Sequence, residues 1–425
     1  MNLVYKILIM KALNLILIFL SVTFFTSCEK EDTDSKKAKF AIPIVKSLSE
    51  IRSSVSVENA QQTNSEGKIY VSKNYLFYIA QEQGVHVINN NNPNNPTNVA
   101  FINIEGVHDI SVKGNYLYAD NFVDLLVFDI SDSNNITLVK TVENSLYYYP
   151  TFPTEAEFYD YTVNPGEGEI ITGFTTEMRN VPDEQYTLLS EDAMASFESN
   201  LSGNGVGVGG SYAKFQINNN ALYTVNSYKL NVFNISDPEN TFFDKEVYMN
   251  MWFGGGELET LFIQNQTLFV GSTVGMFTVD ATDEFNPVFV SGFSHATACD
   301  PVVVFGNTAY ITIRGGNSCG AIEDQINVID VSDIANPTLI STTLVGQPYG
   351  LGIYNDVLYV CCGSNGLKIY NASNSSNIVL ENTYSENLKD VIPLDNRLIA
   401  VGTNKVIQYN YGPNYTLIQI SEITF

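Results

Sequence analysis

The feature that most constrains the fold is an internal repeat of four short segments that alternate apolar and polar residues. Its clearest copy spans residues 107–142, and a Gly-Asn pair separates its first two segments. Alternation of this kind is typical of half-buried β-strands, and such pairs are typical of tight antiparallel turns. The second segment begins at seven places, which are Tyr75, Tyr116, Ala221, Thr267, Thr308, Val357 and Arg397. Apart from one insertion, the copies follow each other at intervals of 40 to 49 residues.

Four strands in about 42 residues make one blade of a β-propeller. We therefore predict an all-β fold, a single propeller of about seven four-stranded blades over residues 51–425. No segment sustains a 3.6-residue period, which excludes a helical solenoid. Ring closure leaves alternatives open: residues 51–57 alternate and either complete the last blade or cap the rim beside it. Residues 415–420 alternate as well, and rings of six or eight blades stay open.

The third and fourth segments carry a recurring motif. It reads LVFDISD at 126–132, NVFNISDP at 231–238 and NVIDVSD at 327–333, the last followed by Asn336 and Pro337. These stretches resemble the LVIVD repeat of β-propeller lipoproteins of Bacteroidetes, and the resemblance covers about residues 67–408 apart from the insertion at 146–210. It implies the propeller fold and an envelope location. It implies no activity, because fold-level similarity does not supply one.

The N-terminus has the organisation of a secretory signal. Lys6 and Lys11 precede an apolar run at residues 12–25, and Thr26 and Ser27 precede Cys28. This order predicts a lipoprotein signal peptide over residues 1–27 whose cleavage leaves Cys28 lipidated by acyl chains such as palmitate. The alternative is a plain signal peptide or an uncleaved anchor, although the run is short for a permanent span.

The residues after Cys28 suggest where the anchored chain is displayed. Lys30, Glu31 and Asp32 resemble the export signal that sends Bacteroidetes lipoproteins to the outer face of the outer membrane. We expect residues 28–50 to be a solvated tether and the protein to be exposed on the cell surface, with a periplasm-facing location as the alternative. The formal net charge of −25 argues against nucleic acid as a partner.

Strand order predicts which loops meet on one face of the propeller. The connections between blades and the turns between the second and third strands share a face, and the insertion at 146–210 rises from it. Its Tyr147-Tyr148-Tyr149 run lies beside many carboxylates, a combination suited to sugar rings or a peptide. A lid with its own small core, or a hairpin added to a blade, is the structural alternative. The starts of the first strands place a candidate ligand site at the channel mouth: His108, Asp109, Lys214, Glu259, Asp300, Tyr349 and Asp390.

The cysteines other than Cys28 favour structural roles. Cys299 and Cys319 reach the same face, and outside the cytoplasm a disulfide between them is expected. Pairing of Cys361 with either one competes. The three histidines show no metal-ligand spacing, no cofactor motif is present, and no nucleophile elbow or phosphate loop is found.

These observations support three functions. The first is a non-catalytic, surface-displayed module that binds a glycan, a peptide or an envelope partner. The second is a hydrolase or lyase acting on extracellular polymer, with its site at the channel mouth near Asp109, Glu259 and Asp300. The third is an assembly subunit that packs beside other outer-membrane proteins. The sequence assigns no catalytic residue, ligand or oligomeric state.

Overall fold

The computed structural model describes residues 35–65, 67–182, 186, 210–226, 228–249, 257–294, 301–315 and 323–425. Contacts divide the chain into two compact units. Of the described residues, the smaller unit contains 35–42, 153–162, 175–182 and 186, and the larger contains the rest. The predicted sites at Cys28, Lys30, Glu31, Asp32, Cys299, Asp300 and Cys319 lie outside the described residues.

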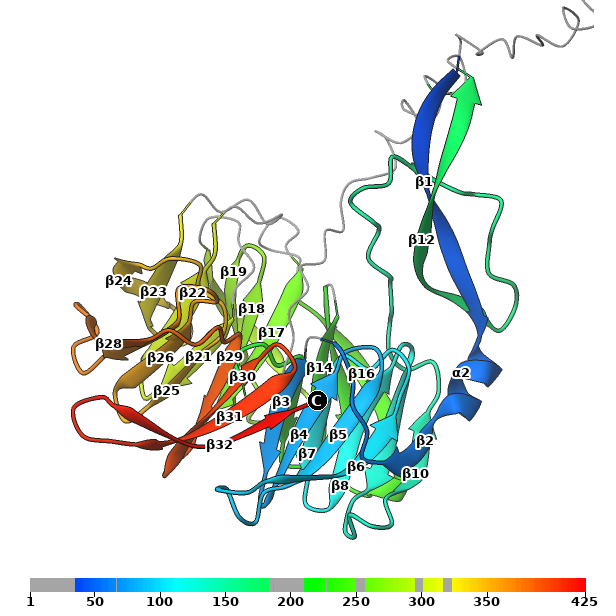
Figure 1. Ribbon diagram of the computed structural model, residues 1–425. Helices are drawn as coiled ribbons and strands as arrows, with labels where there is room; N and C mark the ends of the chain where they lie inside the picture. The colour runs from blue at the N-terminus through cyan, green and yellow to red at the C-terminus, as the bar shows by residue number, and fades with distance from the viewer. Residues whose placement is uncertain are drawn as a thin grey trace, which may run out of the picture. The chain divides into compact units, whose positions relative to one another are not determined.

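The larger unit contains seven antiparallel sheets among the described residues, one for each predicted copy of the repeat (Figure 1). We number them in chain order. Sheet 1 contains β2 (Ser56–Asn59), β3 (Gly67–Ser72), β4 (Tyr75–Ala80), β5 (Gly84–Asn89) and β6 (Thr97–Asn103). Sheet 2 contains β7 (Ile110–Lys113), β8 (Tyr116–Asn121), β9 (Asp124–Asp129) and β10 (Thr137–Val142). Sheet 3 contains β13 (Phe215–Asn218), β14 (Ala221–Asn226), β15 (Lys229–Asn234) and β16 (Phe242–Tyr248), with the short helix η1 (Pro238–Asn240) before its last strand.

The four later sheets have the same up-and-down order. Sheet 4 contains β17 (Leu258–Gln264), β18 (Thr267–Ser272), β19 (Gly275–Asp280) and β20 (Val288–Ser294). Sheet 5 contains β21 (Val302–Phe305), β22 (Thr308–Ile313), β23 (Gln325–Asp330) and β24 (Thr338–Leu344). Sheet 6 contains β25 (Leu351–Tyr354), β26 (Val357–Cys361), β27 (Leu367–Asn371) and β28 (Val379–Tyr384). Sheet 7 contains β29 (Asp390–Pro393), β30 (Arg397–Gly402), β31 (Lys405–Tyr411) and β32 (Leu417–Thr424).

Each sheet shares an apolar core with the next one along the chain, and sheet 7 shares one with sheet 1. At this last interface the rings of Tyr78 and Phe425 stack with their centroids 4.2 Å apart. Asn90 and Gln408 exchange two amide hydrogen bonds of 3.0 and 2.8 Å in a buried position. The first and last sheets therefore lie side by side and close the series (Figure 1). Burial on both faces explains why the inner strands are apolar on both sides.

The recurring motif has a local structural role in the turn after each third strand. The carboxylate of Asp129 accepts the N–H of Ser131 at 2.8 Å, and Asp330 accepts that of Ser332 at the same distance. Asn234 does the same for Ser236 at 3.0 Å. Such Asx turns fix the tight connection to the fourth strand, together with backbone hydrogen bonds such as that from Asn135 N–H to the Asp132 carbonyl. The recurrence of the motif is therefore explained by its role in the turn, and it gives no indication of a ligand.

The predicted strand at residues 51–57 is wrong in its first half. A helix, α2 (Leu48–Ser54), occupies it, and β2 pairs with β6 at the outer edge of sheet 1. Ser47 and Glu50 form a capping box that starts this helix, a signal present in the sequence. The buried side chain of Ile51 fits a helix as well as an alternating strand. Sheet 7 is completed by its own β32, so residues 51–57 do not complete the last blade. Their second half instead adds a strand at the outer edge of sheet 1, the sheet beside it.

The predicted tether is also shorter than expected. Residues 35–47 form the strand β1 (Ser35–Ser47), which leads into α2. Within the insertion, β11 (Phe158–Tyr159) and β12 (Glu169–Pro182) join β1 in a three-stranded sheet, which belongs to no repeat. In the smaller unit the rings of Phe40 and Phe158 lie 5.4 Å apart beside buried Ala38 and Val181. The described part of the insertion therefore forms a small core jointly with β1.

Candidate functional site

A cavity of about 760 Å³ opens on the larger unit at the ends of sheets 1 to 4. Its walls come from connections between sheets and from turns between second and third strands, the two kinds of loop predicted to share a face. The described residues of the insertion that reach it are 146–151 and 172–174. The cavity is therefore formed by loops of one face together with these residues of the insertion.

The segment that leads into sheet 3 is held inside the ring by sheets distant in the chain. Ser211 is buried, and its hydroxyl donates to the Asp390 carboxylate at 3.2 Å and accepts the Leu351 N–H at 2.8 Å. A side chain at Gly210 would overlap that same carboxylate, so the close approach requires glycine. Burial raises the pKa of Asp390 to about 7, and the N–H groups of Val391 and Ser211 moderate the shift. Asp390 therefore fastens this segment to sheets 6 and 7.

Asp109 fastens the other end of the segment. Its carboxylate accepts the backbone N–H of Lys214 at 2.6 Å and that of Ile110 at 2.8 Å, and it lies 4.0 Å from the Lys68 ammonium. Asp109 is only 1% exposed and Lys68 only 4%. Burial lowers the pKa of Lys68 and raises that of Asp109, and each charge moderates the other's shift. All these contacts join the chain to itself, so Asp109 has a folding role in this geometry.

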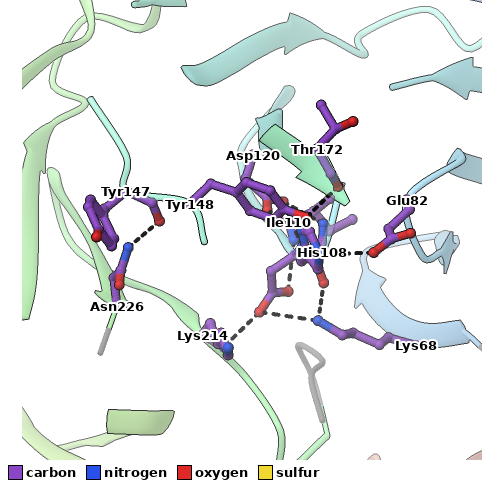
Figure 2. Close-up of polar contacts among 11 residues, drawn as sticks. Lys68, Glu82, His108, Ile110, Asp120, Tyr147, Tyr148, Thr172, Lys214 and Asn226 are labelled. Atoms are coloured by element: carbon purple, nitrogen blue, oxygen red, sulfur yellow. Dashed lines mark hydrogen bonds and ion pairs between the residues drawn. The ribbon is translucent and has the colours of Figure 1, made fainter. Parts of the chain in front are cut away.

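His108 lies between two carboxylates on the cavity wall (Figure 2). Its Nδ1 is 3.2 Å from Asp120 and its Nε2 is 3.8 Å from Glu82. Burial alone lowers the pKa of His108, but the hydrogen bond to Asp120 and the ionic contact with Glu82 together raise it to about 9. The imidazole is therefore protonated at neutral pH. Asp120 also accepts the N–H groups of His108 and Asp109 at 2.8 and 2.7 Å. We call Lys68, His108, Asp109 and Asp120 the buried cluster.

Residues 146–151, which we call the tyrosine strap, form part of the cavity wall. Tyr148 points inward: its ring packs 4.7 Å from Phe122 and 5.7 Å from His108, and its hydroxyl donates to the Thr172 carbonyl at 3.0 Å. Tyr147 and Tyr149 point outward, with 61% and 68% of their surface exposed. Their rings stack with centroids 6.0 Å apart. The strap therefore presents two aromatic faces beside the cavity.

Two further pairs of opposite charge lie on the wall. The Lys46 ammonium bonds the Glu105 carboxylate. Burial raises the pKa of Glu257, and the nearby charge of Lys214 opposes that shift. Asn226 donates its amide to the Tyr147 carbonyl (Figure 2). Glu259 lines the cavity at the start of sheet 4.

The structure brings only part of the predicted mouth site together. His108, Asp109, Lys214 and Glu259 line the cavity, whereas Tyr349 and Asp390 do not. The ring of Tyr349 lies beneath two cations instead, 4.5 Å from the Arg314 guanidinium and 4.1 Å from the Lys389 ammonium. The Asp390 carboxylate accepts the hydroxyl of Ser211 and is buried beneath that segment. The sequence prediction placed all of these residues in one ring because it aligned the starts of the first strands. It could not foresee that the segment at residues 210–214 is held across that ring.

Sequence reasoning missed the partners that define the charge state of the site. Lys68 lies in β3, the inner strand of sheet 1. Glu82 lies in the turn after β4, and Asp120 lies near the end of β8. A lysine within an otherwise apolar inner strand is a signal for a buried ionic contact. Glu82 carries no such signal, because a glutamate in a turn is ordinary.

The cysteines that the structure describes have no reactive features. Cys361 and Cys362 are free and completely buried. Burial raises the pKa of the Cys362 thiol to about 11 and that of Cys361 well above its usual range. Neither forms the competing disulfide. Within the described ranges, no group of three or more His, Cys, Asp or Glu side chains has the arrangement of a metal site. No helix in that part of the chain is long and apolar enough to cross a membrane.

Comparison with known proteins relates the chain to one repeat and one fold. The model of the LVIVD repeat matches residues 106–144, which include all of sheet 2. No curated protein gives a significant match. The periplasmic gluconolactonase PpgL of Pseudomonas aeruginosa superposes with a TM-score of 0.53 at 9% identity, over 87% of this chain and 96% of that one. The computationally designed protein Ika8 gives 0.50 at 9% identity, over 86% and 89%. The chain is therefore a β-propeller that carries an LVIVD repeat.

Proposed function

We propose that this protein is a non-catalytic binding module of the bacterial envelope, whose ligand occupies the cavity beside the tyrosine strap. The observation that carries the proposal is a contrast within that cavity. The buried cluster is paired internally, whereas Tyr147 and Tyr149 present most of their surface to solvent. Exposed aromatic side chains next to a concave polar site are typical of ligand recognition.

The same contrast disfavours the hydrolase or lyase reading. A general acid or base must reach the substrate proton within about 3 Å. Asp109 is 1% exposed and accepts two backbone N–H groups, so it has no such access. The likeness to a gluconolactonase at 9% identity concerns the fold and not the site.

The architecture in the proposal is a closed propeller of seven blades. Its support is the one-to-one match of seven sheets to seven sequence repeats, together with the shared core between sheet 7 and sheet 1. Such closure leaves only short edges exposed.

The address in the proposal is the outer face of the outer membrane. Its support is the sequence alone: the apolar run before Cys28 and the Lys30-Glu31-Asp32 signal after it. Acyl chains on Cys28 contribute about 0.8 kcal/mol per buried CH₂, so two or three chains give a lasting anchor. Protease treatment of intact cells should remove the wild-type protein and spare a variant with all three signal residues changed to Ala. Equal sensitivity of both would contradict the outward address.

The binding function is tested with the soluble chain from residue 35 onward, once urea denaturation shows that this part folds cooperatively. A panel of oligosaccharides and peptides is titrated into wild type and into the Tyr147→Ala/Tyr149→Ala variant, and the mixtures are checked for turnover products. Tyr248→Ala is the matched control, because Tyr248 is 61% exposed on sheet 3 and does not line the cavity. The proposal requires a ligand whose binding depends on the strap and not on Tyr248. Strap-dependent turnover, or no strap-dependent ligand in the panel, would contradict it.

A further inference from the structure

We infer that the ligand of this cavity is an uncharged oligosaccharide whose sugar rings contact Tyr147 and Tyr149. This inference rests on the proposed binding function and specifies its ligand class. The cavity volume of about 760 Å³ lies within the range of roughly 300–1,000 Å³ that is usual for ligand sites.

The charge pattern of the wall is the first argument. Carboxylates outnumber cations there, which disfavours sulfated or uronate-rich glycans: the wall carries Glu82, Glu105, Asp109, Asp120, Glu257 and Glu259 against Lys46, His108 and Lys214. Most of these carboxylates already contact a cation, since Glu105 pairs with Lys46 and His108 lies between Glu82 and Asp120. A cationic peptide would have to displace such partners, and leaving a partly buried charge unpaired is costly.

Paired charges suit hydroxyl groups. A hydroxyl both donates and accepts, so it can bond a carboxylate and a neighbouring ammonium without separating them. Lys46 with Glu105, and Lys214 near Glu257, offer such donor and acceptor combinations along the wall. A sugar carries several hydroxyls around one ring, and it can therefore use several of these combinations together.

The aromatic faces are the second argument. The rings of Tyr147 and Tyr149 stack on each other, so both lie on the same side of the strap, and their planes differ by 23°. The apolar C–H face of a pyranose ring packs on such a surface, while the phenol hydroxyl stays in water. Because the rings stack on each other, their outer faces and edges remain as contact area, and more than 60% of each residue is exposed. Apolar ring surface of this kind suits sugar rings more than a single ion.

The strap is held in place before any ligand arrives. Leu146 donates its N–H to the Val123 carbonyl at 2.9 Å, the Tyr147 carbonyl accepts the Asn226 amide, and the Tyr148 hydroxyl bonds Thr172. A segment fixed at three consecutive residues, 146 to 148, loses less conformational freedom on binding than a free loop. The geometry therefore favours recognition by a preformed surface.

The test is isothermal titration calorimetry with four defined probe sets. These are neutral gluco-, manno- and xylo-oligosaccharides, oligogalacturonates, sulfated heparin oligosaccharides, and lysine-rich peptides. We expect measurable binding of at least one neutral oligosaccharide by wild type. The Tyr147→Ala/Tyr149→Ala variant should lose at least tenfold in affinity, and Tyr248→Ala should stay within twofold of wild type. Tyr147→Phe/Tyr149→Phe should stay within about threefold, because the ring faces are kept.

The outcomes separate this inference from the proposed function. Strap-dependent binding of only the anionic glycans, or of only the peptides, would overturn the ligand class and leave a binding module. An equal loss in the Phe and Ala variants would overturn ring stacking as the mode of contact. Absence of any strap-dependent binding across all four probe sets would overturn both claims.

Discussion

The buried cluster and the tyrosine strap lie at the same cavity and behave in opposite ways. Lys68 and Asp109 are almost completely buried, and their contacts join sheets 1, 2 and 3. Tyr147 and Tyr149 contact mainly each other and solvent. Ionisable residues at a propeller mouth therefore need not form its binding site, because they can be used to fasten the chain. The aromatic side chains that the fold leaves exposed are better candidates for ligand contact.

The largest expected effect follows from removal of one member of the buried cluster. Asp109→Ala leaves the Lys68 ammonium buried and two N–H groups without their acceptor. We expect the free energy of unfolding to fall by about 3–5 kcal/mol in urea denaturation at pH 7. Asp244→Ala is the control: it removes a partly exposed carboxylate beside Lys245, and such pairs contribute about 0–1 kcal/mol.

A double substitution sharpens the same point. Lys68→Met combined with Asp109→Leu removes both charges, and it should be less destabilising than Asp109→Ala alone because no charge is left unpaired. If the double variant is the less stable of the two, the cost lies in packing and not in an isolated charge.

The second effect is a pH dependence at His108. Its pKa is raised from 6.5 to about 9 in the folded protein, so its stabilising contribution is complete below about pH 6.5 and is lost as the pH rises through 9. The shift of about 2.5 corresponds to about 3 kcal/mol, and screening at the 65% exposed Glu82 side chain brings this to about 2–3 kcal/mol.

This dependence is measured as a difference between two proteins. Wild type and His108→Gln are unfolded in urea at pH 6, 8 and 10, and the gap between them should be largest at pH 6 and shrink by pH 10. Other titrating groups cancel in that difference. A gap that is constant with pH would contradict a protonated His108 between Asp120 and Glu82.

The third effect concerns the interface between the first and last sheets. Gln408→Ala removes both hydrogen bonds to Asn90 and leaves that buried amide without its partner. We expect a loss of about 1–3 kcal/mol in the free energy of unfolding. Gln419→Ala, on the exposed face of β32 in the same sheet, should change stability by less than about 0.5 kcal/mol. Equal effects would argue that the two sheets do not depend on this contact.

The sequence predicted the fold well and the site poorly, for physical reasons. Strand segments such as residues 116–119 and 357–360 could be located because alternation and turn residues are local signals. The shared face of the loops followed from strand direction alone. The position of Ser211 against Asp390 could not be predicted, since it depends on a segment that contacts residues 179 positions away. The helix at Leu48–Ser54 was missed although its capping box was readable.

The smallest expected effect on stability accompanies the largest expected effect on binding. Tyr147→Ala/Tyr149→Ala removes side chains that are more than 60% exposed, so its free energy of unfolding should stay within about 0.5 kcal/mol of wild type for each substitution. A larger loss, observed by urea denaturation, would mean that the strap fastens the fold as the buried cluster does.

The central claim, that the strap and not the buried cluster contacts the ligand, is tested most directly by one titration. A neutral oligosaccharide that binds wild type is titrated calorimetrically into the fully folded Tyr147→Ala/Tyr149→Ala variant at pH 7. We predict an affinity at least tenfold weaker than that of wild type. An affinity equal to that of wild type would contradict the claim and return the search for the site to other parts of the molecule.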